Sequence, residues 1–116
     1  KAVNINYVVL EFYMITLTPE AAKQIRFSAK EGSLEGLPIR VAVTKNNDGS
    51  LHYGMGFDDV KEDDTTYTSD GVDVVVSEAS KDLLTGTTID YVELEPGNSQ
   101  FIFMNPNDPD YKPVAE

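Results

Sequence analysis

The sequence predicts an α+β domain that is mainly β: a compact unit of small curved mixed sheets, sandwich-like or barrel-like, with two helices. Three observations support this fold class. Segments in which apolar and polar residues alternate follow one another through most of the chain, as in half-buried strands. Clusters of Gly, Asn, Asp and Pro separate these segments and are typical of tight turns. Strands joined by short turns favour a curved sheet or a small sandwich over a parallel βαβ array.

The first predicted helix begins after Thr18, whose hydroxyl can accept a backbone hydrogen bond as the N-cap. Pro19 suits the first helical position, Glu20 complements the helix dipole, and Gly32 ends the helix. The apolar face repeats at helical spacing through Ala22, Ile25 and Ala29. Phe27 falls on the opposite side. It is therefore either covered by another segment or an exposed contact residue.

Six further segments are predicted to be strands from their alternation and their flanking turns. They are residues 37–43, 51–57, 65–68, 72–76, 88–94 and 100–104. Ser77 caps a second, short helix, which Gly86 closes. Residues 101–104 are apolar on both faces, which predicts a central, buried strand. Gly54 and Gly56 predict a bulge or a close backbone approach within their strand.

The length of 116 residues and the absence of a linker or repeat predict one domain. We assign this domain to residues 14–105. Residues 1–13 alternate like a strand and form an upstream extension, a cloning remnant or an added edge strand. Residues 106–116 form a tail that is rich in proline, with little regular structure expected.

The composition excludes several classes of function. Acidic residues outnumber basic ones by 20 to 9, for a net charge of -11, so nucleic acid and anionic membranes are poor partners. This charge indicates either solubility alone or a basic protein partner. No stretch approaches the ~20 apolar residues of a membrane span. The chain contains no Cys, which excludes disulfides, thiol nucleophiles and clusters ligated by cysteine. A cytoplasmic location is the default expectation.

Four segments, in this order and with their spacing kept, resemble the A-type iron–sulfur carrier (HesB-like) family. They are ITLTPEAA at 15–22, LPIRV at 37–41, LTGTTIDYV at 84–92 and FIFMNPN at 101–107. The resemblance covers residues 14–111 and implies the HesB-like fold for the domain. It also implies a link to iron–sulfur cluster biogenesis.

The chemistry of that family depends on three cysteines, one in a glycine-rich hairpin loop and two in a C-terminal C-G-C. Thiolates suit cluster iron because sulfur is a soft ligand. Aligned on Tyr53, the first cysteine position falls on Asp48. Counted from residues 105–107, the other two fall on Lys112 and Val114. The resemblance therefore implies a member of the family whose three ligand positions are vacated and which holds no cluster as cofactor.

A narrower resemblance is to a branch of the family that has no cysteines and is associated with the gene clusters of dissimilatory sulfur oxidation. The segments that carry it are NNDGS at 46–50, MGFDD at 55–59, EDD at 62–64, YVELEPG at 91–97 and NPNDPDY at 105–111. This resemblance implies a cytoplasmic accessory or regulatory protein rather than an enzyme. Its partners would be proteins of the sulfur-oxidation or iron–sulfur assembly machinery. A monomer and a homodimer are both open.

A carrier of iron or another divalent metal is the alternative function, with Asp48 and His52 as oxygen and imidazole ligands. Each residue also has a structural explanation, because Asp48 lies in a turn and His52 lies within a strand. With one His, no Cys and no nucleophile elbow, we identify no catalytic site. We expect residues 58–64 to form a solvated acidic loop. The predicted interaction surface consists of Phe27, Asp58, Asp59, Asp63, Asp64 and Tyr111.

Overall fold

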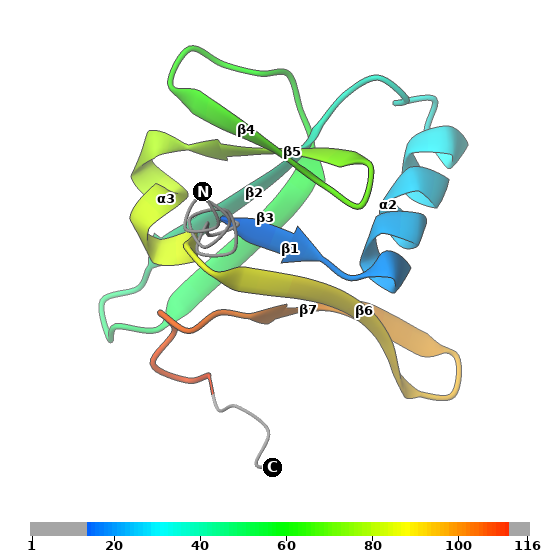
Figure 1. Ribbon diagram of the computed structural model, residues 1–116. Coiled ribbons are helices and arrows are strands. Elements are labelled where there is room, and N and C mark those ends of the chain that lie inside the picture. The colour runs from blue at the N-terminus through cyan, green and yellow to red at the C-terminus, as the bar shows by residue number, and fades with distance from the viewer. Residues whose placement is uncertain (1–13, 112–116) are drawn as a thin grey trace, which may run out of the picture.

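The computed structural model describes residues 14–111, which form seven strands and two helices (Figure 1). The strands are β1 (Ile15–Leu17), β2 (Ile39–Lys45), β3 (Leu51–Phe57), β4 (Asp64–Ser69), β5 (Val72–Ser77), β6 (Thr87–Glu95) and β7 (Asn98–Met104). The helices are α2 (Pro19–Glu31) and α3 (Glu78–Leu84). All six strands predicted from alternation are present, and so are both helices. The extension 1–13 and residues 112–116 lie outside the described residues.

Helix α2 begins as its sequence predicts. The Thr18 hydroxyl accepts a 3.1 Å hydrogen bond from the Ala21 N–H, and Pro19 is the first helical residue. The buried face contains Ala21, Ala22, Ile25 and Ala29. Ser77 precedes α3 in an extended conformation, but its side chain makes no capping hydrogen bond. Within residues 14–111, no helix combines the length and the apolar character that crossing a membrane requires.

The strands form two separate mixed sheets. One has the order β3-β2-β5-β4 and the other the order β1-β6-β7. The pairs β2–β5 and β1–β6 are parallel, whereas β2–β3, β4–β5 and β6–β7 are antiparallel. Figure 1 shows α2 to the right of the strands and α3 to their left. This architecture confirms the predicted fold class, although the two sheets do not close into a barrel.

The core lies where the inward faces of both sheets meet the helices. Ile39, Val41 and Val43 alternate inward along β2, and Val74 and Val76 do so along the neighbouring β5. The other large, well-buried side chains of this cluster are Ile15, Leu17, Ile25, Leu84 and Ile89. Burial of these aliphatic side chains stabilises the domain by roughly 1.5–3 kcal/mol for each one.

Two predictions about strand environment are wrong. Residues 101–104 belong to β7, which is an edge strand and only partly buried. One face of β7 packs against the core through Phe101 and Phe103, and the other face is not covered by a described element. Gly54 and Gly56 lie in an unbroken ladder, and a Cβ atom at either would meet no atom within 4 Å. The register shift lies instead between Glu93 and Glu95 of β6.

Candidate functional site

The loop between β2 and β3 contains Asp48, the first of the positions predicted to replace a cysteine. The Asn46 N–H donates a 2.8 Å hydrogen bond to the Ser50 carbonyl and closes the loop. The Asp48 carboxylate accepts hydrogen bonds from the Ser50 N–H, at 3.0 Å, and from the Ser50 hydroxyl, at 2.6 Å. These bonds from Ser50 lower the pKa of Asp48 below its ordinary value. The carboxylate is therefore engaged in holding the turn.

The segment after β7 precedes the other two predicted positions in the sequence. Asn105 begins it and is fully buried. Its amide nitrogen donates a 2.8 Å hydrogen bond to the Leu83 carbonyl and a 3.2 Å bond to the Tyr53 hydroxyl. Its amide oxygen accepts from the Asn107 N–H at 2.9 Å. A buried side chain with both ends of its amide satisfied fixes where the chain leaves the sheet.

Tyr53 joins the two segments. Its hydroxyl donates a 2.6 Å hydrogen bond to Asp108, and its ring stacks on Phe103 with 4.6 Å between the ring centroids. Burial, followed by the bond to Asp108, raises the pKa of Tyr53 to about 12. We call the group Tyr53, Asn105 and Asp108 the polar tie. It holds the base of the C-terminal segment against the strand that follows the Asp48 loop.

Hydrogen-bonded turns organise the described part of the tail, residues 106–111. The Asp108 N–H donates to the Asn105 carbonyl and the Tyr111 N–H donates to the Asp108 carbonyl, both at 3.0 Å. Two consecutive turns therefore run as far as Tyr111, which is half-buried. Lys112 and Val114 lie outside the described residues.

The donor set at this end of the molecule does not fit an iron–sulfur cluster, because clusters in this kind of site need thiolates and the chain has no Cys. Oxygen and imidazole donors are also scattered. His52 is exposed and pairs across the ladder with Thr44, while Asp48 is bonded to Ser50. Across residues 14–111, no three His, Asp or Glu side chains are grouped closely enough to hold a metal ion.

The acidic loop is not the uniformly solvated segment that its composition predicts. Arg40 donates a 2.8 Å hydrogen bond from Nε to Asp58 and another of 2.8 Å from Nη1 to Asp64, whose side chain is fully buried. Lys61 forms a third ion pair, with Asp58 at 2.9 Å. The pKa of Asp58 is lowered to about 2 by Lys61 and then by Arg40, and that of Asp64 to about 2 by Arg40. Asp64 is thus not available as a docking residue.

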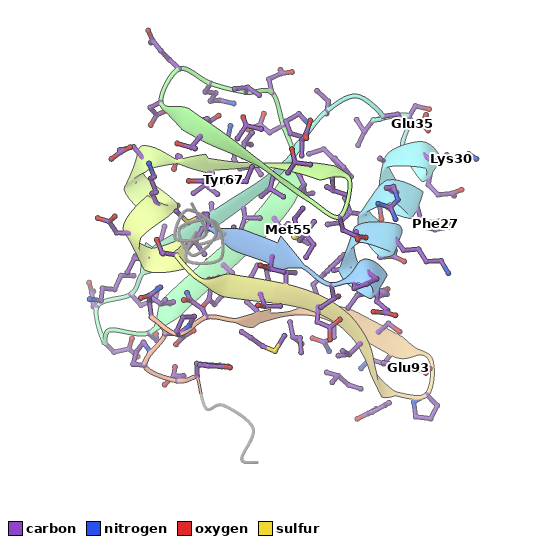
Figure 2. All side chains as sticks on the ribbon, viewed as in Figure 1. Phe27, Lys30, Glu35, Met55, Tyr67 and Glu93 are labelled. Carbon is purple, nitrogen blue, oxygen red and sulfur yellow. The ribbon has the colours of Figure 1, made fainter. Side chains whose placement is uncertain are left out.

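The remaining residues of the predicted surface do not lie together. Asp59 and Asp63 are exposed in the loop before β4, at the top of Figure 1, whereas the segment that ends at Tyr111 lies at the bottom. Phe27 is 57% exposed on the outward side of α2, as Figure 2 shows. It borders a separate hollow of about 350 Å³, together with Tyr91. The structure therefore places these residues on three different surfaces.

Sequence reasoning missed the residues that organise the site. Arg40 had a usable signal, because it is a cation at an outward position of a half-buried strand in a chain rich in carboxylates. Asn105 and Tyr53 stand out in the sequence only as parts of motifs. The bond between Tyr53 and Asp108 spans 55 positions, and no local pattern encodes a contact over that distance.

Comparisons with known proteins agree on one family. The family model described as "Iron-sulphur cluster biosynthesis" matches residues 14–110. The iron-sulfur cluster insertion protein ErpA 2 of Methylococcus capsulatus is 39% identical over 94 residues, which cover 80% of this chain and 72% of that protein. The iron-sulfur cluster insertion protein ErpA of Pseudomonas entomophila is 38% identical over 94 residues, 80% of each chain.

Solved structures give the same result for the fold. Escherichia coli SufA, described as involved in biosynthesis of iron-sulfur clusters, has a TM-score of 0.66 at 27% identity, covering 84% of this chain and 91% of that one. A crystal structure of IscA with the [2Fe-2S] cluster also has a TM-score of 0.66, at 26% identity, covering 79% and 85%.

Proposed function

Because this chain belongs to the iron–sulphur cluster biosynthesis family, we propose that it is a non-catalytic accessory or regulatory protein of iron–sulfur or sulfur metabolism that acts through protein contacts and holds no cluster. One observation carries this proposal: the chain matches the family model over residues 14–110 and contains no Cys. We propose that the vacated cysteine positions are Asp48, Lys112 and Val114. The link to iron–sulfur metabolism is supported by relatives that are named as iron-sulfur cluster insertion proteins.

The bonds of two acidic residues, Asp48 and Asp108, support a settled change of role. If the scaffold had only lost its cysteines, we would expect the loop and the tail that held them to lack hydrogen bonds that fix their conformation. Here the Asp48 carboxylate holds its turn through Ser50, and Tyr53 bonds to Asp108 on the tail. Hydrogen bonds between oxygen and nitrogen groups thus organise both segments in the described chain. The tie presents a defined surface that a protein partner can recognise.

The resemblance to the family branch without cysteines points to sulfur oxidation as the process in which the protein acts. We propose on this ground a cytoplasmic protein whose partner belongs to the sulfur-oxidation or iron–sulfur assembly machinery. Its acidic surface, with a net charge of -11, suits a basic partner rather than nucleic acid or an anionic membrane.

Anaerobic incubation of the full chain with ferrous iron and sulfide, followed by desalting, tests the proposal. We expect no stable visible absorption band and iron well below one atom per chain. A persistent cluster spectrum with stoichiometric iron would overturn it.

Titration with ferrous iron or zinc distinguishes the proposed accessory protein from the alternative, a metal carrier that uses oxygen and imidazole ligands. We expect Asp48→Ala and His52→Ala each to leave the weak affinity of the chain unchanged. A loss of affinity in both variants would favour the carrier.

A further inference from the structure

Two edge strands, one from each sheet, lie on the same side of the molecule. β3 is one of the two outer strands of the four-stranded sheet, and β7 is one of the two outer strands of the other sheet. They meet where Tyr53 stacks on Phe103. Further along both strands a hollow of about 220 Å³ opens, lined chiefly by the apolar side chains of Ile25, Met55 and Phe101. We call this hollow, with the edges of β3 and β7 beside it, the seam.

Neither edge carries the usual protection against pairing. β7 reads NSQFIFM and β3 reads LHYGMGF, so neither contains Asp, Glu, Lys, Arg or Pro. Natural edge strands commonly use charges, proline or bulges to prevent the addition of another strand. Among the described residues β7 pairs only with β6, which leaves the backbone groups of its other edge without a strand partner. A long uncharged edge of this kind can accept an extended peptide.

The hollow gives this edge a place for a side chain. Phe101 and Phe103 lie on the inward face of β7, and Phe101 is one of the residues that line the hollow. An added strand beside β7 would direct alternate side chains to the same face. One of these side chains would enter the hollow between Met55 and Ser28. In strand addition, backbone hydrogen bonds give affinity and such pockets give specificity.

Charge decides what kind of segment fits. Glu93 and Glu95 are exposed at the far end of the β6–β7 ribbon, where Figure 2 labels Glu93. Asp108 and Asp110 follow β7 at its other end. The uncharged edge is therefore flanked by carboxylates at both ends. Antiparallel pairing with a second copy would place the Glu93 end of one chain opposite the Asp108 end of the other, and like charges repel.

We propose that the seam binds an extended segment of another protein, which adds to the edge of β7 with an apolar side chain in the hollow and basic residues at both ends. This proposal rests on the proposed function, because that function requires a protein partner, and it names the kind of segment that the partner would supply. The two fail separately, since the proposed function is tested by iron content and the seam by peptide binding. A chain that carried iron could still bind the segment, and a chain without iron could fail to bind it.

A synthetic peptide of alternating valine and threonine with a lysine at each end is the probe, and a version with glutamate ends is its control. Two-dimensional NMR titration of the full chain should shift the amide signals of β7 and those around Met55. We expect the lysine peptide to bind about tenfold more tightly than the glutamate peptide, and N-methylation of its backbone to abolish binding. Absence of shifts in β7, or equal affinity for both peptides, would overturn the proposal.

Two variants test the parts separately. Glu93→Lys combined with Glu95→Lys should remove most of the preference for the lysine peptide, because only the carboxylates of Asp108 and Asp110 then remain beside the edge. Ser28→Phe should fill the hollow and weaken binding by about tenfold, whereas Glu31→Phe, on an exposed position of the same helix that does not line the hollow, should not. Unchanged affinity in Ser28→Phe would overturn the proposal. So would sedimentation of the free chain as a dimer with the β7 amides in its interface, because the occupant would then be a second copy.

Discussion

Tyr53 donates a 2.6 Å hydrogen bond to Asp108, and this bond joins β3 to the C-terminal segment. Asn105 also donates to the same hydroxyl, at 3.2 Å, from a fully buried position. The phenol therefore acts as donor and acceptor at once. Through it, the strand that follows the Asp48 loop and the segment that leads to Lys112 and Val114 are held as one surface.

Replacing Tyr53 with Phe should separate the hydrogen bond from the ring packing. Tyr53→Phe keeps the stack on Phe103 and should lower the free energy of unfolding by about 1 kcal/mol. Hydrogen exchange should speed up at the amides of Asp108 and Tyr111, which form the turns after Asn105. Tyr53→Leu also removes the stack and should cost about 1 kcal/mol more. Equal stability of the wild type and Tyr53→Phe in urea unfolding would contradict the tie.

Alkaline pH should weaken the same bond. The pKa of Tyr53 is raised to about 12 in the folded chain, above the ordinary value of about 10. The neutral phenol is therefore favoured by folding, and its contribution is complete below pH 10 and lost as the pH rises towards 12. Tyr53→Phe lacks this group. The stability difference between wild type and variant should shrink from pH 10 to 12, and a constant difference would contradict the assignment.

Acid should weaken the ion pairs around Arg40. The folded pKa values of Asp58 and Asp64 are about 2, below their ordinary value. Their contribution is therefore complete above about pH 4 and lost as the pH falls through 2. Arg40→Met should destabilise the chain at neutral pH, because it leaves the buried Asp64 side chain without its cation. It should also flatten the dependence of urea unfolding on pH between 4 and 2.

Lys61 provides the matched control for that experiment. Its side chain is 57% exposed and its partner Asp58 is 39% exposed, so solvent screens this pair. Lys61→Met should change the stability much less than Arg40→Met. Similar losses in the two variants would show that burial of Asp64 is not what makes the Arg40 cluster important.

Gly86 and Gly97 allow backbone strain to be separated from packing. Both have positive φ, +86° and +79°, so alanine at either should cost about 1 kcal/mol in strain. A Cβ atom at Gly86 would also lie 3.3 Å from Cγ of Pro106, whereas one at Gly97 would meet nothing within 4 Å. Thermal unfolding should therefore show a larger loss for Gly86→Ala. Equal losses would mean that the segment after Asn105 can move away freely.

Local sequence patterns predicted the helices and strands, but they did not predict which strands lie beside one another in the sheets. The Thr18 cap, the helical repeat of Ile25 and Ala29, and the alternation along β2 each report an environment that extends over a few residues, and each is confirmed. Residues 101–104 looked central because both faces are apolar. Sheet order decides centrality, and it depends on pairings between distant strands that no local alternation contains.

The site was predictable only where the sequence could be aligned. Asp48 lies in the expected turn, because Asn, Asp and Gly define such turns locally. The roles of Arg40 and Asp64 were not predicted, since an acidic run reads as solvated until the fold places a cation beside it. The tie from Tyr53 to Asp108 depends on the packing of β3 against β7.

We propose that this scaffold holds no cluster because its cysteine positions are occupied by Asp48, Lys112 and Val114. The most direct measurement is the iron content after anaerobic reconstitution of two chains side by side: the wild type and a variant with Asp48→Cys, Lys112→Cys and Val114→Cys. We expect the variant to retain iron and sulfide with a visible cluster spectrum after desalting, while the wild type retains neither. Stoichiometric iron and a stable cluster in the wild type would contradict it.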